Sequence, residues 1–119
     1  MKKIFLILIL LIFIFTPAVY ADRNTATVTT YKASALIKTG DAKIYYISFV
    51  PTSNSGYFIV LNATSDTTSS GTGFADVKAE GQEATSGNSQ FQDFSNKPLE
   101  MSTGLYLVIS NGYVTLHYE

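Results

Sequence analysis

A chain of 119 residues with a net charge of −1 has room for one domain and lacks the strong positive charge of a nucleic-acid-binding protein. Beyond Lys2 and Lys3, its basic residues are scattered, so neither a nucleic-acid groove nor a patch for anionic membranes is expected. The chain contains no cysteine, which excludes disulfides and leaves the packing of apolar side chains as the source of stability.

The first 21 residues have the pattern of a secretory signal peptide. Lys2 and Lys3 form a short basic region, residues 4–15 are all apolar, and Ala21 closes a cleavage-site pattern. Retention as a membrane anchor is the alternative, but the apolar run is shorter than the roughly 20 residues that span a bilayer. We therefore predict a signal peptide at 1–21 and one domain at 22–119. The protein would be secreted, periplasmic or on the cell surface, with no membrane span after cleavage.

The chain after residue 21 consists of short alternating or β-branched runs, separated by turn residues at intervals of roughly ten residues. This spacing is typical of an all-β domain, and no segment keeps apolar residues at helical spacing. Polar loops are expected at 64–73 and 80–88. The runs predict a strand at Thr25–Tyr31, which Ala33–Lys38 continues after a bend. Further strands are predicted at Lys43–Val50, Tyr57–Ala63, Gly73–Ala79, Gln90–Phe94 and Lys97–Met101, with two more within Leu105–Tyr118.

Lys43–Val50 has apolar residues on both faces. Alternation places Tyr45, Ile47 and Phe49 on one face and Ile44 on the other. Because both faces are largely apolar, we predict that this strand lies in the middle of a sheet or beneath a partner surface.

Leu105–Tyr118 contains two alternating runs around Asn111 and Gly112, a pair that favours the type I′ turn of a tight β-hairpin. Such a turn would place Leu107 directly opposite Leu116 and give the ribbon one apolar face. A lone hairpin is marginally stable in water, so we expect the other strands to cover that face.

About eight antiparallel strands in so short a chain fit a single β-sandwich of jelly-roll or Greek-key type. A small closed barrel is the alternative. The long polar loops favour the sandwich, because an up-and-down barrel is built with short turns throughout.

Three segments carry a resemblance to a known class of protein. They are the strand and turn at Gly56–Thr64, the run Pro98–Val108, and Asn111-Gly112 with the strand that follows it. In order and spacing, over about Ala35–Tyr118, the chain resembles small all-β proteins of tailed-phage virions. The resemblance implies a jelly-roll or sandwich-like fold and a virion-like structural role.

The residues that carry chemistry do not form a recognisable site. His117 is the only histidine, too few ligands for a transition-metal site, and we expect it on an open strand face beside Tyr106. The carboxylates are scattered through predicted turns, and no pair is favoured as acid and base. Asp66 with Asn62 is a candidate calcium site but matches no loop signature, and Asn62 also begins an N-glycosylation triplet. We therefore predict no enzyme activity, no cofactor and no metal.

Tyrosine is abundant, and exposed tyrosines are enriched at interfaces because the ring is apolar and the hydroxyl is polar. We therefore predict an exported, non-catalytic structural or interaction subunit that binds a protein partner or copies of itself. A small carbohydrate- or ligand-binding module is the alternative, and a secreted hydrolase is the third hypothesis. The possible interaction surface comprises Tyr45, Tyr46, Tyr57, Tyr106 and Tyr113.

Overall fold

The computed structural model describes residues 26–67 and 76–119, and these residues form strands without a helix. The predicted signal peptide at 1–21 and the start of the predicted strand Gly73–Ala79 lie outside the described residues. The prediction of an all-β domain is confirmed. The described strands are β1 (Thr27–Tyr31), β2 (Ala35–Thr39), β3 (Ala42–Pro51), β4 (Gly56–Asn62), β5 (Val77–Glu83), β6 (Gln90–Asp93), β7 (Leu99–Met101), β8 (Gly104–Ser110) and β9 (Gly112–Tyr118).

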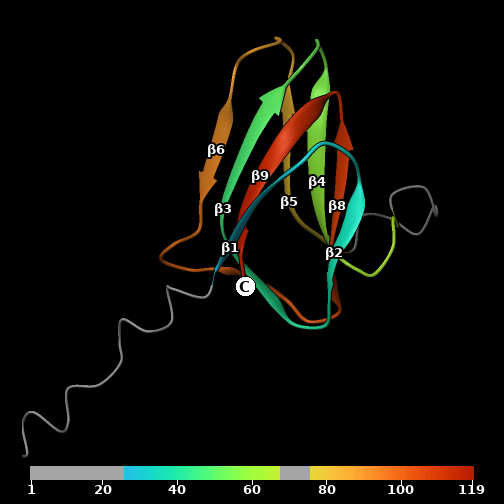
Figure 1. Cartoon of the computed structure of the whole chain (residues 1–119), viewed down its shortest axis with the longest axis vertical. Helices are drawn as coiled ribbons and strands as arrows, with labels where there is room; N and C mark the ends of the chain where they lie inside the picture. Colours follow the sequence, from blue (N-terminus) through green and yellow to red (C-terminus); the bar gives the residue numbers. More distant parts are fainter. Residues whose placement is uncertain (1–25, 68–75) are drawn as a thin grey trace, which may run out of the picture.

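The strands form two antiparallel sheets that pack face to face. Sheet A has the order β1-β9-β3-β6, and β7 also pairs with β3; sheet B has the order β2-β8-β4-β5. Figure 1 shows β6, β3 and β9 toward one side of the molecule and β4, β8 and β2 toward the other. The sandwich is therefore confirmed, and the closed barrel is not formed.

The predicted hairpin at Asn111 and Gly112 is wrong, because β8 and β9 belong to different sheets. β8 pairs with β2 and β4, whereas β9 pairs with β1 and β3. Asn111 has a positive φ of 52°, but Gly112 does not adopt the second positive φ of a type I′ turn. The chain therefore crosses from one sheet to the other, and Leu107 and Leu116 are both buried in the core between the sheets.

The core lies between the two sheets and is centred on two aromatic rings. Phe49 of β3 and Phe58 of β4 meet with ring centroids 5.3 Å apart. A Cβ atom at Gly112 would overlap the ring of Phe49, and one at Gly81 would overlap the ring of Phe58. Glycine at these two positions lets the strands approach the rings. The buried core residues are Ala42, Ile44, Ile47, Phe49, Phe58, Val60, Met101, Leu105, Leu107, Val114 and Leu116.

β3 lies in the middle of sheet A, with β9 along one edge and β6 and β7 along the other, which confirms that prediction. The predicted faces of β3 are only partly correct. The pairing with β9 shifts register between Ile44 and Tyr46, which is the mark of a β-bulge. The extra residue at Tyr45 lets Ile44 and Ile47 both point into the core, where strict alternation would separate them.

β5 continues to Glu83, although Glu80–Glu83 has the composition of a loop. The segment pairs in register with β4 from Gly56 to Ile59, so tertiary pairing overrides its low strand propensity. The predicted loop therefore shortens to residues 84–89.

Candidate functional site

The five tyrosines singled out in the sequence lie on two opposite faces of the sandwich. Tyr46 and Tyr113 point outward from sheet A, in register with His117 and Val50 respectively, while Tyr57 and Tyr106 point outward from sheet B. Tyr45 lies at the bulge of β3 and is half-buried. The structure therefore does not gather the five tyrosines into one surface.

The outward side chains of sheet A lie in three rows that cross the strands, and together they are called the outer face of sheet A. The first row is Val28, His117, Tyr46 and Asp93. The second row is Thr30, Thr115, Ser48 and Phe91. The third row is Tyr113 and Val50, and Lys32 completes it with its Nζ 5.4 Å from the Tyr113 ring centroid.

Three rings on this face stack on one another across three strands. The Tyr46 ring lies between Phe91, with centroids 5.6 Å apart, and His117, with centroids 5.5 Å apart. His117 also makes a tilted contact with Tyr45, so its predicted place beside Tyr106 is wrong: β9 is in sheet A and β8 is in sheet B. Because Phe91 and His117 cover the two faces of the Tyr46 ring, the edge of this ring and its hydroxyl remain for contact with a partner.

Exposed apolar side chains concentrate on the same face. Six large hydrophobic side chains are exposed among the described residues, and four of them belong to the outer face of sheet A. These are Val28 (64%), Phe91 (64%), Val50 (39%) and Tyr113 (39%). A shallow hollow of about 310 Å³ lies among them, lined by Val28, Tyr46, Ser48, Phe91, Thr115 and His117.

Charge on the outer face of sheet A is confined to two opposite corners, where Asp93 ends the first row and Lys32 ends the third. Hydrogen bonds from the side chain and backbone N–H of Ser95, the latter 2.8 Å from Asp93 Oδ1, hold the pKa of Asp93 below its usual range. The Asp93 carboxylate is therefore ionised at neutral pH. Just beyond the first row, Lys43 and Glu119 form an ion pair at 3.3 Å.

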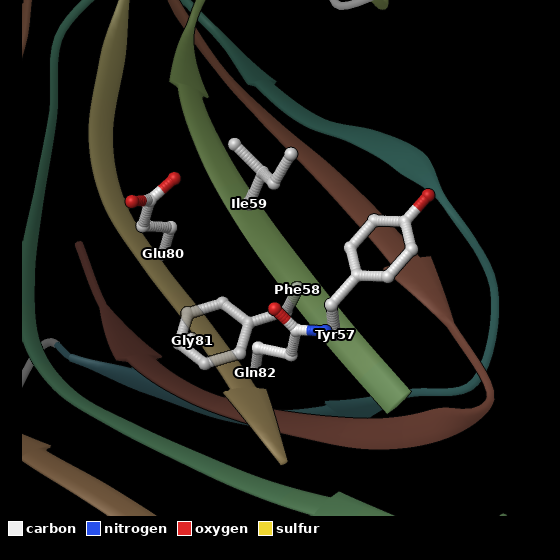
Figure 2. Close-up of a pocket in the computed structure, with 6 residues that line it drawn as sticks. All are labelled: Tyr57, Phe58, Ile59, Glu80, Gly81 and Gln82. Atoms are coloured by element: carbon white, nitrogen blue, oxygen red, sulfur yellow. The ribbon is translucent and has the colours of Figure 1, made fainter. Parts of the chain in front are cut away.

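The outer face of sheet B has a different character. Tyr57, which is 39% exposed, lines a hollow of about 390 Å³ together with Glu80 and Gln82 on the neighbouring edge strand β5. Figure 2 shows the Glu80 carboxylate and the Tyr57 ring on either side of Ile59. Tyr106 instead packs on a small buried cluster around Leu61.

The side chain of Asn62 has a structural role. Its Oδ1 accepts hydrogen bonds from the backbone N–H groups of Ser102 (2.9 Å) and Thr103 (2.8 Å), and its Nδ2 donates to Ser102 Oγ (3.3 Å). Since both lone pairs of the oxygen are used, Asn62 has no acceptor left for the calcium site suggested with Asp66. Among the described residues, no three His, Cys, Asp or Glu side chains are grouped so as to hold a metal ion.

Sequence reasoning missed most of the outer face of sheet A. Val28, Phe91, Asp93 and Lys32 were not among the candidate residues, although Phe91 lies between two glutamines in an alternating run. That alternation was the available signal, because the glutamines face β5 and leave Phe91 on the outside.

No helix in the part of the chain that the structure describes is long and apolar enough to cross a membrane. Comparison of the chain with known protein families, with curated proteins and with solved structures finds no match.

Proposed function

We propose that the protein is an exported, non-catalytic structural or interaction subunit that works through the outer face of sheet A. The observation that carries this proposal is the concentration there of four of the six exposed large hydrophobic side chains of the described residues. Exposed apolar groups that gather on one face, bordered by polar residues, are characteristic of protein interaction sites. The resemblance to small virion proteins agrees with an assembly role and stays a prediction.

The contacts of the face support binding in preference to catalysis. His117 contacts the rings of Tyr45 and Tyr46, and the second row offers the hydroxyls of Thr30, Thr115 and Ser48. Two of these hydroxyls already bond each other, with Thr30 Oγ1 2.8 Å from Thr115 Oγ1. Such a surface offers both apolar contact and hydrogen bonds, the two kinds of contact that protein–protein interfaces contain.

Photo-crosslinking in the exporting cell tests the proposal. Phe91 and Tyr57 are exposed aromatic residues on opposite faces, so the larger side chain of benzoylphenylalanine at either position extends into solvent and not into the core. Adducts at position 91 and none at position 57 are expected. Adducts at position 57 alone, or at neither position, would overturn the proposal.

Export is tested separately by the mass of the protein recovered from the medium or the cell envelope. Cleavage after Ala21 would leave Asp22 as the first residue. Recovery of the intact 119-residue chain from the cytoplasm alone would contradict the predicted signal peptide.

A carbohydrate-binding module is the second candidate function, and the hollow on sheet B favours it. Tyr57 offers a ring, while Glu80 and Gln82 offer polar groups of the kind that fix a sugar's hydroxyls. Saturable binding on a glycan array that Tyr57→Ala abolishes and Phe91→Ala preserves would support this function. Absence of glycan binding would exclude it.

A further inference from the structure

The corner charges of the outer face of sheet A lie on one diagonal of a nearly square patch. With ideal spacings of about 4.8 Å between strands and about 6.7 Å between rows, Asp93 and the end of β1 next to Lys32 are about 14 Å apart across the strands and about 13 Å apart along them. Between these corners the face carries no aspartate, glutamate, lysine or arginine in the described chain. A matching partner therefore needs a positive charge opposite Asp93, a negative charge opposite Lys32 and an uncharged surface between them.

A second copy of this chain has that pattern. Two such faces can meet through a two-fold axis that lies in the interface, perpendicular to the diagonal from Asp93 to Lys32. This operation brings Asp93 of each copy onto Lys32 of the other, which is the self-complementary contact of an isologous dimer. Any axis parallel to the strands or to the rows would instead leave both charged corners facing uncharged ones.

The same axis also pairs the exposed apolar side chains. Val28 lies at a corner that the axis crosses, so it meets Val28 of the second copy. Phe91, at the end of the second row, falls between Val50 and Tyr113 of the second copy. All four exposed hydrophobic side chains of the face are thereby covered by one another.

We infer that the outer face of sheet A binds a second copy of this chain face to face, with Asp93 and Lys32 paired across a two-fold axis. This inference rests on the proposed function and names its partner. The near-square grid makes the strands of the two facing sheets cross at close to a right angle, one of the two usual packings of sheets.

The size of the face predicts a weak dimer. Four strands and three rows cover about 400 Å² in projection on each copy, a small patch for an interface when a standard stable one buries roughly 800 Å² of accessible surface per partner. The dimer should therefore form at high protein concentration and dissociate on dilution.

Charge reversal tests the pairing, with sedimentation velocity of the exported protein, as the cell processes it, at about 10 µM to 1 mM as the readout. Lys32→Asp and Asp93→Lys, each alone, set like charges against each other at both ends of the dimer and should weaken association about 10-fold. An equimolar mixture of the two variants restores opposite charges at both ends, so it should associate as the wild type does. High salt should reduce these differences.

A pair of uncharged substitutions keeps the inference testable if a charge variant folds poorly. Val28→Ser removes an apolar contact of the dimer, and Val28 is 64% exposed. Leu36→Ser removes an aliphatic side chain that is also exposed, at 41%, but lies on sheet B. Only Val28→Ser should lower self-association. A mixture of charge variants that stays as weak as its components, or equal effects of the two serine variants, would overturn the inference.

The outcomes separate this inference from the proposed function. A wild-type protein that stays monomeric at 1 mM while position 91 crosslinks to a different protein would overturn the second copy as partner and leave the face as the working surface. Crosslinking at neither position 91 nor 57 overturns the proposed function itself.

Discussion

The hydroxyl of Tyr31 lies 3.0 Å from the hydroxyl of Tyr118, so the adjacent strands β1 and β9 are joined by a side-chain hydrogen bond besides their backbone ladder. Burial, with a contribution from the bond to Tyr118, raises the pKa of Tyr31 from 10.0 to about 12. The folded state therefore holds the Tyr31 proton more tightly than the unfolded chain does.

This difference predicts a loss of stability at alkaline pH. Because the folded pKa is the higher one, the contribution of Tyr31 is complete below about pH 10 and is lost as the pH rises toward 12. Tyr31→Phe should be less stable than the wild type at pH 8, and the gap between them should close above pH 10. Urea unfolding followed by circular dichroism, at pH 8 and above pH 10, measures the difference in unfolding free energy between the two proteins. A difference that stays constant with pH would contradict the assignment.

The sequence was sufficient to predict the layers of the fold but not the pairing of its strands. Alternation at Leu107 and Leu116 correctly indicated the buried face of each strand. The same alternation is compatible with a hairpin, in which the two strands lie side by side in one sheet. It is equally compatible with a crossing between sheets, in which the two strands face each other. Deciding between them depends on contacts made elsewhere in the chain, such as the close approach of Gly112 to Phe49, which no local pattern reveals.

The candidate site was harder to predict for a similar reason. Tyr46 and Tyr57 look alike in the sequence, yet they point to opposite sides of the sandwich because β3 and β4 belong to different sheets. The bulge at Tyr45 further reverses the expected face of Ile44. Residue composition indicated that tyrosines were in excess, whereas only the strand order shows which neighbours each one has.

Asn62 should be a stabilising residue of the turn between β7 and β8. Asn62→Ala removes the acceptor for the backbone N–H groups of Ser102 and Thr103, and we expect a loss of about 1 kcal/mol in unfolding free energy because water can reach the freed groups. Asn62→Asp keeps an acceptor oxygen and serves as the control, with a smaller loss. Urea unfolding distinguishes them, and an Asn62→Ala variant as stable as the wild type would show that the bonds contribute nothing.

Gly112 should be sensitive to the smallest added side chain. In Gly112→Ala the new methyl group would overlap the ring of Phe49 and lie 3.0 Å from the Val50 carbonyl oxygen, so we expect a destabilisation of about 1–3 kcal/mol. Combining it with Phe49→Leu tests the cause, because a smaller side chain makes room for the methyl group. The double variant should then lose less stability than the sum of the single variants, and strict additivity would place the clash elsewhere.

Gln90 and Gln92 close one open side of the sandwich, where edge strand β6 of sheet A runs beside edge strand β5 of sheet B. Gln92 Nε2 donates to the Glu80 carbonyl oxygen at 2.9 Å, and Gln90 Nε2 donates to the Gln82 carbonyl oxygen at 2.5 Å. These bonds occupy carbonyl groups on the edge of β5 that would otherwise be open to strands of other molecules.

Removing this connection should loosen β6 without unfolding the domain. Gln92→Ala breaks the bond to Glu80 at an exposed site, so the unfolding free energy should fall by no more than about 1 kcal/mol. Amide hydrogen exchange in Gln90–Asp93 should nevertheless accelerate several-fold, because local opening no longer breaks that bond. Gln82→Ala is the matched control, since its side chain is exposed on the outer face of sheet B, and it should leave exchange in β6 unchanged. Equal exchange rates in both variants would mean that β6 is held by its pairing with β3 alone.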